Sequence, residues 1–394
     1  MRFSVSSLVS ALFHPELGPS VWTGSTAVAV RRGLRREIVA LLAAALTLGA
    51  APIAPVAPPA YVDITWMSVT NMYYEVGPLR IVTDGYLSRI PRDVFLGGRT
   101  GMAQSRAPQR PNVPVVARVL AALGGPSYVN LLLTGHSHFD HSFDTGTWSS
   151  LTGARVIGSR TSCLQVFAER LPRDRCTAVS GGEKFDLAQG VTMRVVRWNH
   201  SGDAATNPEQ HNAVELDSVP HVDLETGGMR VGLAEDFPNG GGSRAFLFTV
   251  DGPDGRFSWF FNNSASPVDL AEPIVVDGVN YGAPLENLQA AMRDAGLASV
   301  DLWIGSVGLP VARLVTPVLH PKAFIPVHWD DFYSPFEAGV TRPYADSALE
   351  SFLSSGGITL LKPAQYMDKW RLDPNGVRPI DNSMIKRLLG FALR

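Results

Sequence analysis

Residues 129–141 read VNLLLTGHSHFDH, and this stretch constrains the fold more than any other part of the sequence. An apolar run without interruption that ends in a glycine is typical of a strand buried on both faces. His136 and His138 are two residues apart, so in an extended chain their side chains point the same way. Asp140 and His141 follow once the chain turns. We therefore expect four good metal ligands at the end of one buried strand.

Imidazole and carboxylate groups suit zinc, with iron or manganese as alternatives. A polar loop with chance histidines is the competing explanation, but a His and Asp cluster at the mouth of a buried strand is typical of a metal site. Other classes of site find little support. Neither cysteine lies in a CxxC pair, which excludes a cysteine zinc site. The sequence contains no GxSxG motif, so it gives no indication of a serine nucleophile. The net charge of -2 gives no basic field for nucleic acid.

The HxHxDH spacing resembles the signature of the metallo-β-lactamase superfamily of hydrolases. Other motifs of that family have counterparts in the same order: LRIVTDG contains Asp84, TMRVVRWNHSG contains His200 and AFIPVHWDDF contains His328. The resemblance covers residues 61 to about 370, which is most of the folded chain. The PxHWDDF ending is most similar to the branch that contains ascorbate-6-phosphate lactonase and the phospholipase-D-type N-acylethanolamine hydrolases.

This resemblance implies an α+β fold, a four-layer αβ/βα sandwich of two mixed β-sheets flanked by helices, with the metals at one edge. It implies two ligand sets, and Asp84 would accept a hydrogen bond from a ligand histidine and fix its tautomer. The first metal would be held by His136, His138 and His200, and the second by Asp140, His141 and His328.

One position departs from the family pattern. Where the family has an aspartate that bridges the two metals, the stretch WFFNNSAS places Asn263. We count Asn263 with the metal-site residues, but a neutral amide should weaken one site or favour a single metal. An aspartate there should then raise the occupancy of a second metal. A shifted alignment is the alternative, with Asp269 as the nearest carboxylate able to reach the site.

The chemistry that follows is metal-dependent hydrolysis of a small-molecule substrate. One or two zinc ions, with iron or manganese possible, would hold a hydroxide that attacks an ester, lactone or phosphodiester. Asp140 is the predicted catalytic residue, orienting the water and passing its proton to the leaving group. Two alternatives stay open: an iron-dependent redox member of the same fold, and a degenerate non-catalytic metal-binding protein that lost turnover through Asn263. A β-lactamase is poorly supported.

Loops around the site should choose the substrate. Two groups of side chains are candidates, although solvated arginines and core aromatics would explain them equally. Arginines that can grip an anion are Arg99, Arg106 and Arg110; aromatic residues that can line an apolar pocket are Trp329, Phe332, Tyr333 and Phe336. We consider His211 a possible substrate contact or a surface-loop residue, and His320 structural.

The first sixty residues differ from the rest. A basic cluster at 31–36 precedes an apolar run, Ile38 to Leu48, and then small residues and prolines. This order predicts a signal peptide or leader with a proline-rich linker over 1–60, and a metallo-hydrolase domain over 61–394. Some thirty residues precede the basic cluster, and one hypothesis is that the true start lies later, near Val30. We expect export to the periplasm or outside the cell; an uncleaved segment would give the only membrane contact, and without a signal the protein would be cytoplasmic.

Short apolar runs alternate with turn clusters along the domain. Strands are predicted at 62–70, 79–85, 129–135, 154–159, 192–199, 245–250, 256–262, 301–306 and 323–329, and helices at 113–123, 162–171, 285–296, 345–355 and, as a short docked helix, 383–393. Cys163 and Cys176 can form a disulfide in an exported protein or remain as two buried thiols. The sequence does not indicate an oligomeric state.

Overall fold

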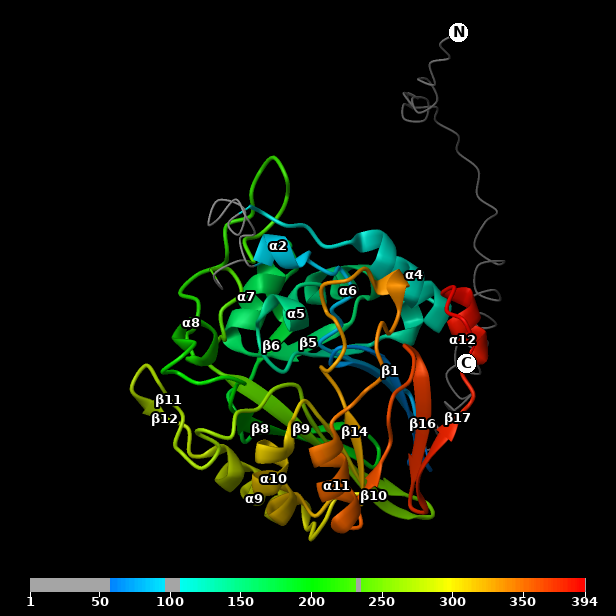
Figure 1. Cartoon of the computed structure of the whole chain (residues 1–394). Helices are drawn as coiled ribbons and strands as arrows, with labels where there is room; N and C mark the ends of the chain where they lie inside the picture. The colour runs from blue at the N-terminus through cyan, green and yellow to red at the C-terminus, as the bar shows by residue number, and fades with distance from the viewer. Residues whose placement is uncertain (1–56, 96–106, 232–234, 394) are drawn as a thin grey trace, which may run out of the picture. The chain divides into compact units, whose positions relative to one another are not determined.

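The computed structural model describes residues 57–95, 107–231 and 235–393. Contacts group Val56–Arg394 into one compact unit. The predicted leader lies outside the described residues up to position 56. Everything that follows concerns this unit (Figure 1).

The first sheet has eight strands in the order β17-β16-β1-β2-β3-β4-β5-β6. Neighbours are antiparallel from β17 to β3 and parallel from β3 to β6. The strands are β1 (Val62–Ser68), β2 (Asn71–Val76), β3 (Leu79–Thr83), β4 (Leu131–Leu133), β5 (Arg155–Gly158), β6 (Cys176–Ala178), β16 (Asp368–Asp373) and β17 (Gly376–Ile380).

The second sheet has seven strands in the order β15-β14-β13-β10-β9-β8-β7. It is parallel from β15 to β10 and antiparallel from β10 to β7, so it too is mixed. The strands are β7 (Lys184–Ala188), β8 (Val191–Trp198), β9 (Ser243–Gly252), β10 (Gly255–Asn262), β13 (Leu302–Gly305), β14 (Ala323–Pro326) and β15 (Thr359–Leu360); β11 (Val275–Val276) and β12 (Val279–Asn280) form a separate small ribbon.

Helices flank both sheets (Figure 1). The helices beside the first sheet are α4 (Val113–Leu123), α6 (Thr145–Thr152) and α7 (Arg160–Ala168), and those beside the second are α9 (Pro284–Ala295), α10 (Leu309–Leu319) and α11 (Ser347–Ser355). The shorter helices are α2 (Arg92–Phe95), α5 (Phe139–Ser142), α8 (Pro208–His211) and α12 (Ser383–Leu388). Among the described residues, no helix has the length and apolar character needed to cross a bilayer.

One hydrophobic core joins the two sheets. Tyr74 of β2 stacks on Trp259 of β10 with ring centroids 5.7 Å apart, and Phe248 of β9 stacks on the same indole at 4.4 Å. A second cluster packs the other face of the second sheet against α9, α10 and α11. Because helices, sheet, sheet and helices succeed one another, the predicted fold class, two mixed sheets flanked by helices, is confirmed.

Helix α4 shows why local patterns predict some elements well. Pro114 lies in its first turn, where a missing N–H costs nothing, and Gly124 follows its end with φ 121°. Its apolar residues repeat at helical spacing and are buried. By contrast, α10 was not predicted, because Pro317 lies inside it and proline normally interrupts a helix.

Cys163 of α7 and Cys176 of β6 are joined by a disulfide, which resolves the two alternatives left by the sequence. The bond fastens a helix to the edge strand of the first sheet. It closes a short loop, with the two cysteines 13 residues apart. A cross-link of this kind limits the freedom of the unfolded chain and so favours the folded state.

We predict that the double variant Cys163→Ser/Cys176→Ser loses about 3 kcal/mol of unfolding free energy, the magnitude expected for a loop of this size. Denaturant unfolding of the variant beside the oxidised and the reduced wild-type protein measures the loss. The reduced wild type should match the variant. Two free thiols in unfolded, unreduced wild-type protein would contradict the prediction.

Candidate metal centre

The six predicted ligands lie together where strands of both sheets end. His136 and His138 follow β4, Asp140 and His141 lie in α5, and His200 and His328 follow β8 and β14. They form two groups, and within each group the possible ligand atoms all lie within 4.8 Å of one another. The groups are His136, His138 and His200, and Asp140, His141 and His328. Their role as metal ligands stays a prediction.

The first group is built on extended backbone. His138 has φ −63° and ψ 154° and caps the start of α5, so the chain turns only after the second histidine. Nε2 of His136 lies 3.2 Å from Nδ1 of His138. The ring of His200 is 4.7 Å from that of His136 and 4.5 Å from that of His138, centroid to centroid. Three rings therefore converge on one point.

The second group surrounds the carboxylate of Asp140. Its Oδ2 lies 3.2 Å from Nε2 of His328 and 3.5 Å from Nε2 of His141. Burial opposes ionisation of Asp140, but the neighbouring His141 and His328 outweigh it and hold the pKa of this carboxyl below its ordinary value. A carboxylate with two imidazole nitrogens is a ligand set for a divalent cation.

Oxygen atoms behind the rings fix which nitrogen faces the centre. Nδ1 of His141 lies 3.0 Å from Asp84 Oδ2 and 2.9 Å from the hydroxyl of Thr70. Nδ1 of His200 lies 2.7 Å from the carbonyl of Ser201. A proton on Nδ1 then leaves Nε2 free to donate its lone pair toward the centre. Asp84 thus lies where the sequence predicted it.

The chemistry of the donors fits a metal. Burial lowers the pKa of His136 and His200 well below the ordinary histidine value, and lowers that of His138 to about 4. The imidazoles are therefore neutral, the form that binds metal. Nε2 of His136 and Nδ1 of His138 lie 3.2 Å apart, and a cation between these neutral rings would bind the lone pairs that they present to each other. Nε2 of His138, the other nitrogen of that ring, is buried without a hydrogen-bond partner among the described residues.

Asn263 lies at the site, but not where the sequence comparison placed it. Its Oδ1 is 3.1 Å from Nδ1 of His136, and its Nδ2 donates to Asp84 Oδ2 at 2.9 Å. Nδ2 is also 3.3 Å from Nδ1 of His141. These contacts are on the Nδ1 side of both rings, whereas the Nε2 atoms face the other ligands. The amide therefore lies behind the histidines and not between the two groups.

A buried clamp that the sequence did not reveal holds His328. The backbone N–H of His328 donates to the carbonyl of Val69 at 2.9 Å, and the N–H of Val69 donates to both oxygens of Asp330 at 3.1 Å. Asp330 also accepts from the hydroxyl of Tyr366 at 2.7 Å and lies 3.9 Å from the buried guanidinium of Arg89. The only hint was that Asp330 stands two residues after a predicted ligand.

A pocket of about 260 Å³ opens onto the two groups. His138, Asp140, His200 and His328 lie in its wall. The rest of the wall is mainly apolar or aromatic, contributed by Phe139, Val231, Phe237, Phe332 and Tyr333, with Ser201 and Gln210 as polar members.

Of the aromatic residues suggested by the sequence, Phe332 and Tyr333 line this pocket, Trp329 lines a neighbouring one and Phe336 is buried in the core. Arg110 is exposed and lines none of the described pockets near the site. Arg99 and Arg106 lie outside the described residues.

The remaining polar candidates lie beside the site. Nε2 of His211 is 2.9 Å from Asp269, whose carboxylate also accepts from Asn199. The hydrogen bond to Asp269 raises the pKa of His211. Asp269 is thus occupied by these two partners and does not replace an aspartate at the centre. His320 ends α10 in a left-handed conformation, with φ 43°, and belongs to neither ligand group.

No family model and no curated protein matches the sequence. Solved structures do match in fold. One is a metallo hydrolase from the archaeon Ignicoccus hospitalis (TM-score 0.42, 13% identity, 79% of this chain and 99% of that chain). Another is a metallo-β-lactamase mutant from Cronobacter sakazakii (0.31, 16%, 64% and 80%). A third is CmlA, a diiron β-hydroxylase from Streptomyces venezuelae (0.41, 13%, 80% and 54%).

Scores and identities this low say nothing about the chemistry of this chain. The resemblance to the metallo-β-lactamase superfamily instead rests on the chain itself. The two mixed sheets, the order of the motifs and the meeting of the six residues at the strand ends are all present. The predicted fold of two mixed sheets flanked by helices is confirmed, whereas membership of the superfamily and of the branch stays a prediction.

We predict that Asp330→Asn loosens His328, because an amide leaves the Val69 N–H with a weaker acceptor and Arg89 without its charge partner. The expected loss is roughly 2 kcal/mol of unfolding free energy, together with less metal bound per chain. Denaturant unfolding and elemental analysis measure the two effects. Asp331→Asn is the matched control, since the carboxylate of Asp331 accepts from Tyr333 and Ser334 in its own loop, and the bond from Arg89 goes to the backbone carbonyl of Asp331, which the substitution leaves in place. Equal behaviour of the two variants would contradict the clamp.

Proposed function

We propose that this protein is a metal-dependent hydrolase that acts on a small ester, lactone or phosphodiester. One observation carries the proposal: two groups of three donors, all but His328 buried, each have members in the wall of a pocket open to a small molecule. Catalytic zinc sites have three protein ligands and keep a further position for water or substrate. Each group offers that number, so the six residues suffice for two ions without Asn263.

Zinc is the metal that we propose for this site. A bound divalent ion would supply a Lewis acid and would lower the pKa of its water from about 15.7 to about 7. His136, His138 and His200 would hold one ion through neutral imidazole nitrogens, and Asp140, His141 and His328 would hold the other.

Asp140 is the proposed general base. Its side chain lines the pocket, and its Oδ2 lies between the Nε2 atoms of His141 and His328. Since Oδ2 is directed at the two imidazoles, the other oxygen of Asp140 would accept the proton of the attacking water and pass it to the leaving group. The apolar wall around it excludes bulk water and strengthens these electrostatic interactions.

We predict that His136→Ala binds less metal and loses hydrolytic activity by more than roughly 100-fold, since even partners behind a ligand are worth 10- to 100-fold. Metals per chain and turnover of a panel of ester, lactone and phosphodiester substrates measure the effect. His221→Ala is the control, because His221 is an exposed histidine outside both groups. Full activity in His136→Ala would refute the proposed function.

Asn263 is proposed as a positioning residue rather than a ligand. Its amide joins Asp84 to Nδ1 of His136, so one side chain orients two others that face the metals. Its place is tightly defined, because a Cβ on Gly135 would lie only 2.2 Å from its Nδ2. The site therefore needs a side chain that both donates and accepts, as an amide does: it donates to Asp84 and accepts from His136.

We predict that Asn263→Asp lowers metal content and stability, the reverse of the expectation from sequence. The new carboxylate would stand about where Nδ2 now lies 2.9 Å from Asp84, and two buried carboxylates that close repel each other. Elemental analysis and thermal unfolding measure the change. The exchanged pair Asp84→Asn/Asn263→Asp restores one donor and one acceptor, and a double-mutant cycle should show partial rescue. Higher metal occupancy in Asn263→Asp would restore the bridging interpretation.

A second candidate is an iron-dependent redox protein of the same fold. The observation that favours it is the donor set of the second group, one carboxylate and two histidines, which is the facial triad of non-haem iron sites. Elemental analysis of the protein as purified from its own host, with a measurement of oxygen consumption, separates the candidates. Iron with oxygen uptake would favour the redox function, and zinc without it the hydrolase.

Export is also proposed. The disulfide supports it, because such bonds persist mainly in oxidising compartments. The predicted leader provides the route. N-terminal sequencing of the protein from its host, with fractionation of the cells, tests both points; an intact leader on protein in the cytoplasm would contradict them.

A further inference from the structure

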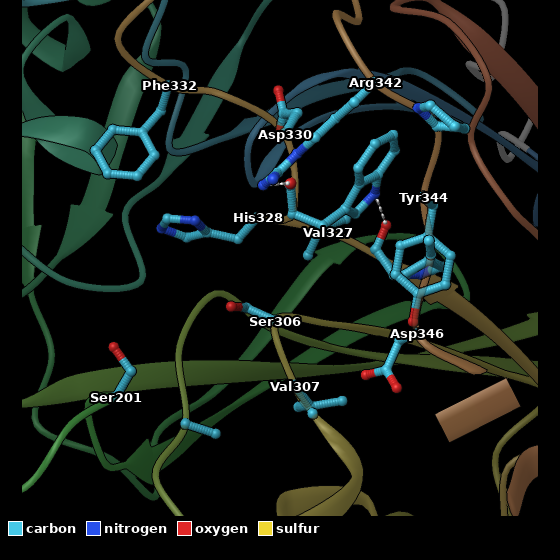
Figure 2. A pocket seen from close by; sticks show the side chains of 16 residues that line it. Ser201, Ser306, Val307, Val327, His328, Asp330, Phe332, Arg342, Tyr344 and Asp346 are labelled. Carbon is cyan, nitrogen blue, oxygen red and sulfur yellow. Dashed lines mark hydrogen bonds between the residues drawn. The ribbon is translucent and has the colours of Figure 1, made fainter. Parts of the chain in front are cut away.

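The pocket over the metal groups continues into a second one. This second pocket has a volume of about 560 Å³ and shares Ser201, His328 and Phe332 with the first. Figure 2 shows His328, Phe332 and Ser201 at one end of it, and Tyr344 and Asp346 at the other. A substrate bound at His328 therefore has room on both sides, and we call the two spaces the aromatic pocket and the Arg342 pocket.

The two pockets differ in chemistry. Apart from the six candidate ligands, no charged side chain among the described residues lines the aromatic pocket. The Arg342 pocket instead presents a guanidinium, the hydroxyl of Ser306 and the phenol of Tyr344. The hydroxyl of Tyr344 is buried without a hydrogen-bond partner among the described residues. Burial raises the pKa of Tyr344, so the phenol keeps its proton and can donate it in a hydrogen bond.

Arg342 has donors to spare. Its Nη2 donates to the carbonyl of Trp329 at 3.0 Å, which directs the side chain back toward the His328 loop (Figure 2). No ion pair of Arg342 is present among the described residues. The carboxylates of the same pocket are engaged elsewhere: Asp330 binds Val69 and Tyr366, and Asp346 accepts from the N–H of Leu349 at the start of α11. A guanidinium with free donors suits a planar carboxylate or a phosphate.

We infer that the substrate is an acyl ester with an anionic leaving group: the acyl chain lies in the aromatic pocket, and the anion is bound by Arg342. This inference rests on the proposed function and names its substrate class. In the reaction the acyl C–O bond breaks and a C–O bond to the oxygen of water forms. The proton of that water ends on the oxygen of the departing alcohol or phenol, so no oxidant, reductant or further reactant is needed.

Two chromogenic hexanoate esters test the inference on the metal-loaded protein. One has 4-nitrophenol as the leaving group, and the other has 5-hydroxy-2-nitrobenzoate, which differs by one carboxylate. The wild type should prefer the carboxylated ester. Arg342→Gln should lower kcat/KM for that ester by roughly 10- to 100-fold, the worth of a hydrogen bond to a charged group, mostly through KM. The uncharged ester should change less than about twofold.

Arg313→Gln is the control, since Arg313 is an exposed arginine of α10 outside the pocket; it should leave both esters unaffected. Equal effects of Arg342→Gln on both esters, or no preference in the wild type, would overturn the inference while leaving the hydrolase intact.

If the wild type cleaves neither ester, the esterase form of the proposed function fails, and binding decides the subsite separately. Calorimetry with 5-hydroxy-2-nitrobenzoate itself should show binding to the wild type that Arg342→Gln weakens by at least about tenfold. Equal binding to both proteins would show that Arg342 does not bind the anion.

Discussion

The buried carboxylate of Asp84 is the interaction on which the candidate site depends. Its Oδ2 accepts from Thr70 at 2.6 Å and Asn263 at 2.9 Å and lies 3.0 Å from Nδ1 of His141, while its Oδ1 accepts from the N–H of Gly135. These partners come from the β1–β2 turn, the end of β10, α5 and the end of β4. A buried charge is stable only when it is so fully paired. One side chain thus fixes parts of both sheets relative to each other.

The ligand histidines depend on this pairing for their chemistry as well as for their place. Burial lowers the pKa of His136 and His200, so these imidazoles are neutral, and a neutral imidazole has one nitrogen that donates a proton and one that donates a lone pair. Asp84, Asn263 and the carbonyl of Ser201 each engage the Nδ1 atom of a different ring. The rings of His136, His141 and His200 therefore present Nε2 to the same space. The acceptors behind the rings therefore fix which nitrogen of each candidate ligand faces the centre.

The sequence was informative where chemistry and local structure coincide. HSHFDH follows an apolar run directly, so strand, loop and donors could be read together, and His200 and His328 likewise end predicted strands. The parts that were missed depend on distant contacts. Asp330 acts through Val69, 261 residues away in the chain, and β16 pairs with β1 from the other end of the domain, with Val62 opposite Leu372. The position of Asn263 in the sequence also could not show that its side chain lies on the Nδ1 side of the histidine rings.

Backbone strain links the clamp to the site. Val69, Asp84 and His328 all adopt left-handed conformations, with φ of 46°, 57° and 63°. Such conformations cost of order 1–3 kcal/mol for residues other than glycine, and most for a β-branched one such as valine. They persist only where surrounding contacts over-determine them. At Val69 those contacts are the two oxygens of Asp330 on its N–H and the N–H of His328 on its carbonyl. The strained turn and the ligand therefore share one hydrogen-bonded unit, in which His328 cannot shift without releasing Val69. A ligand held this way loses little freedom when a metal binds, and the cost of ordering it is met when the chain folds.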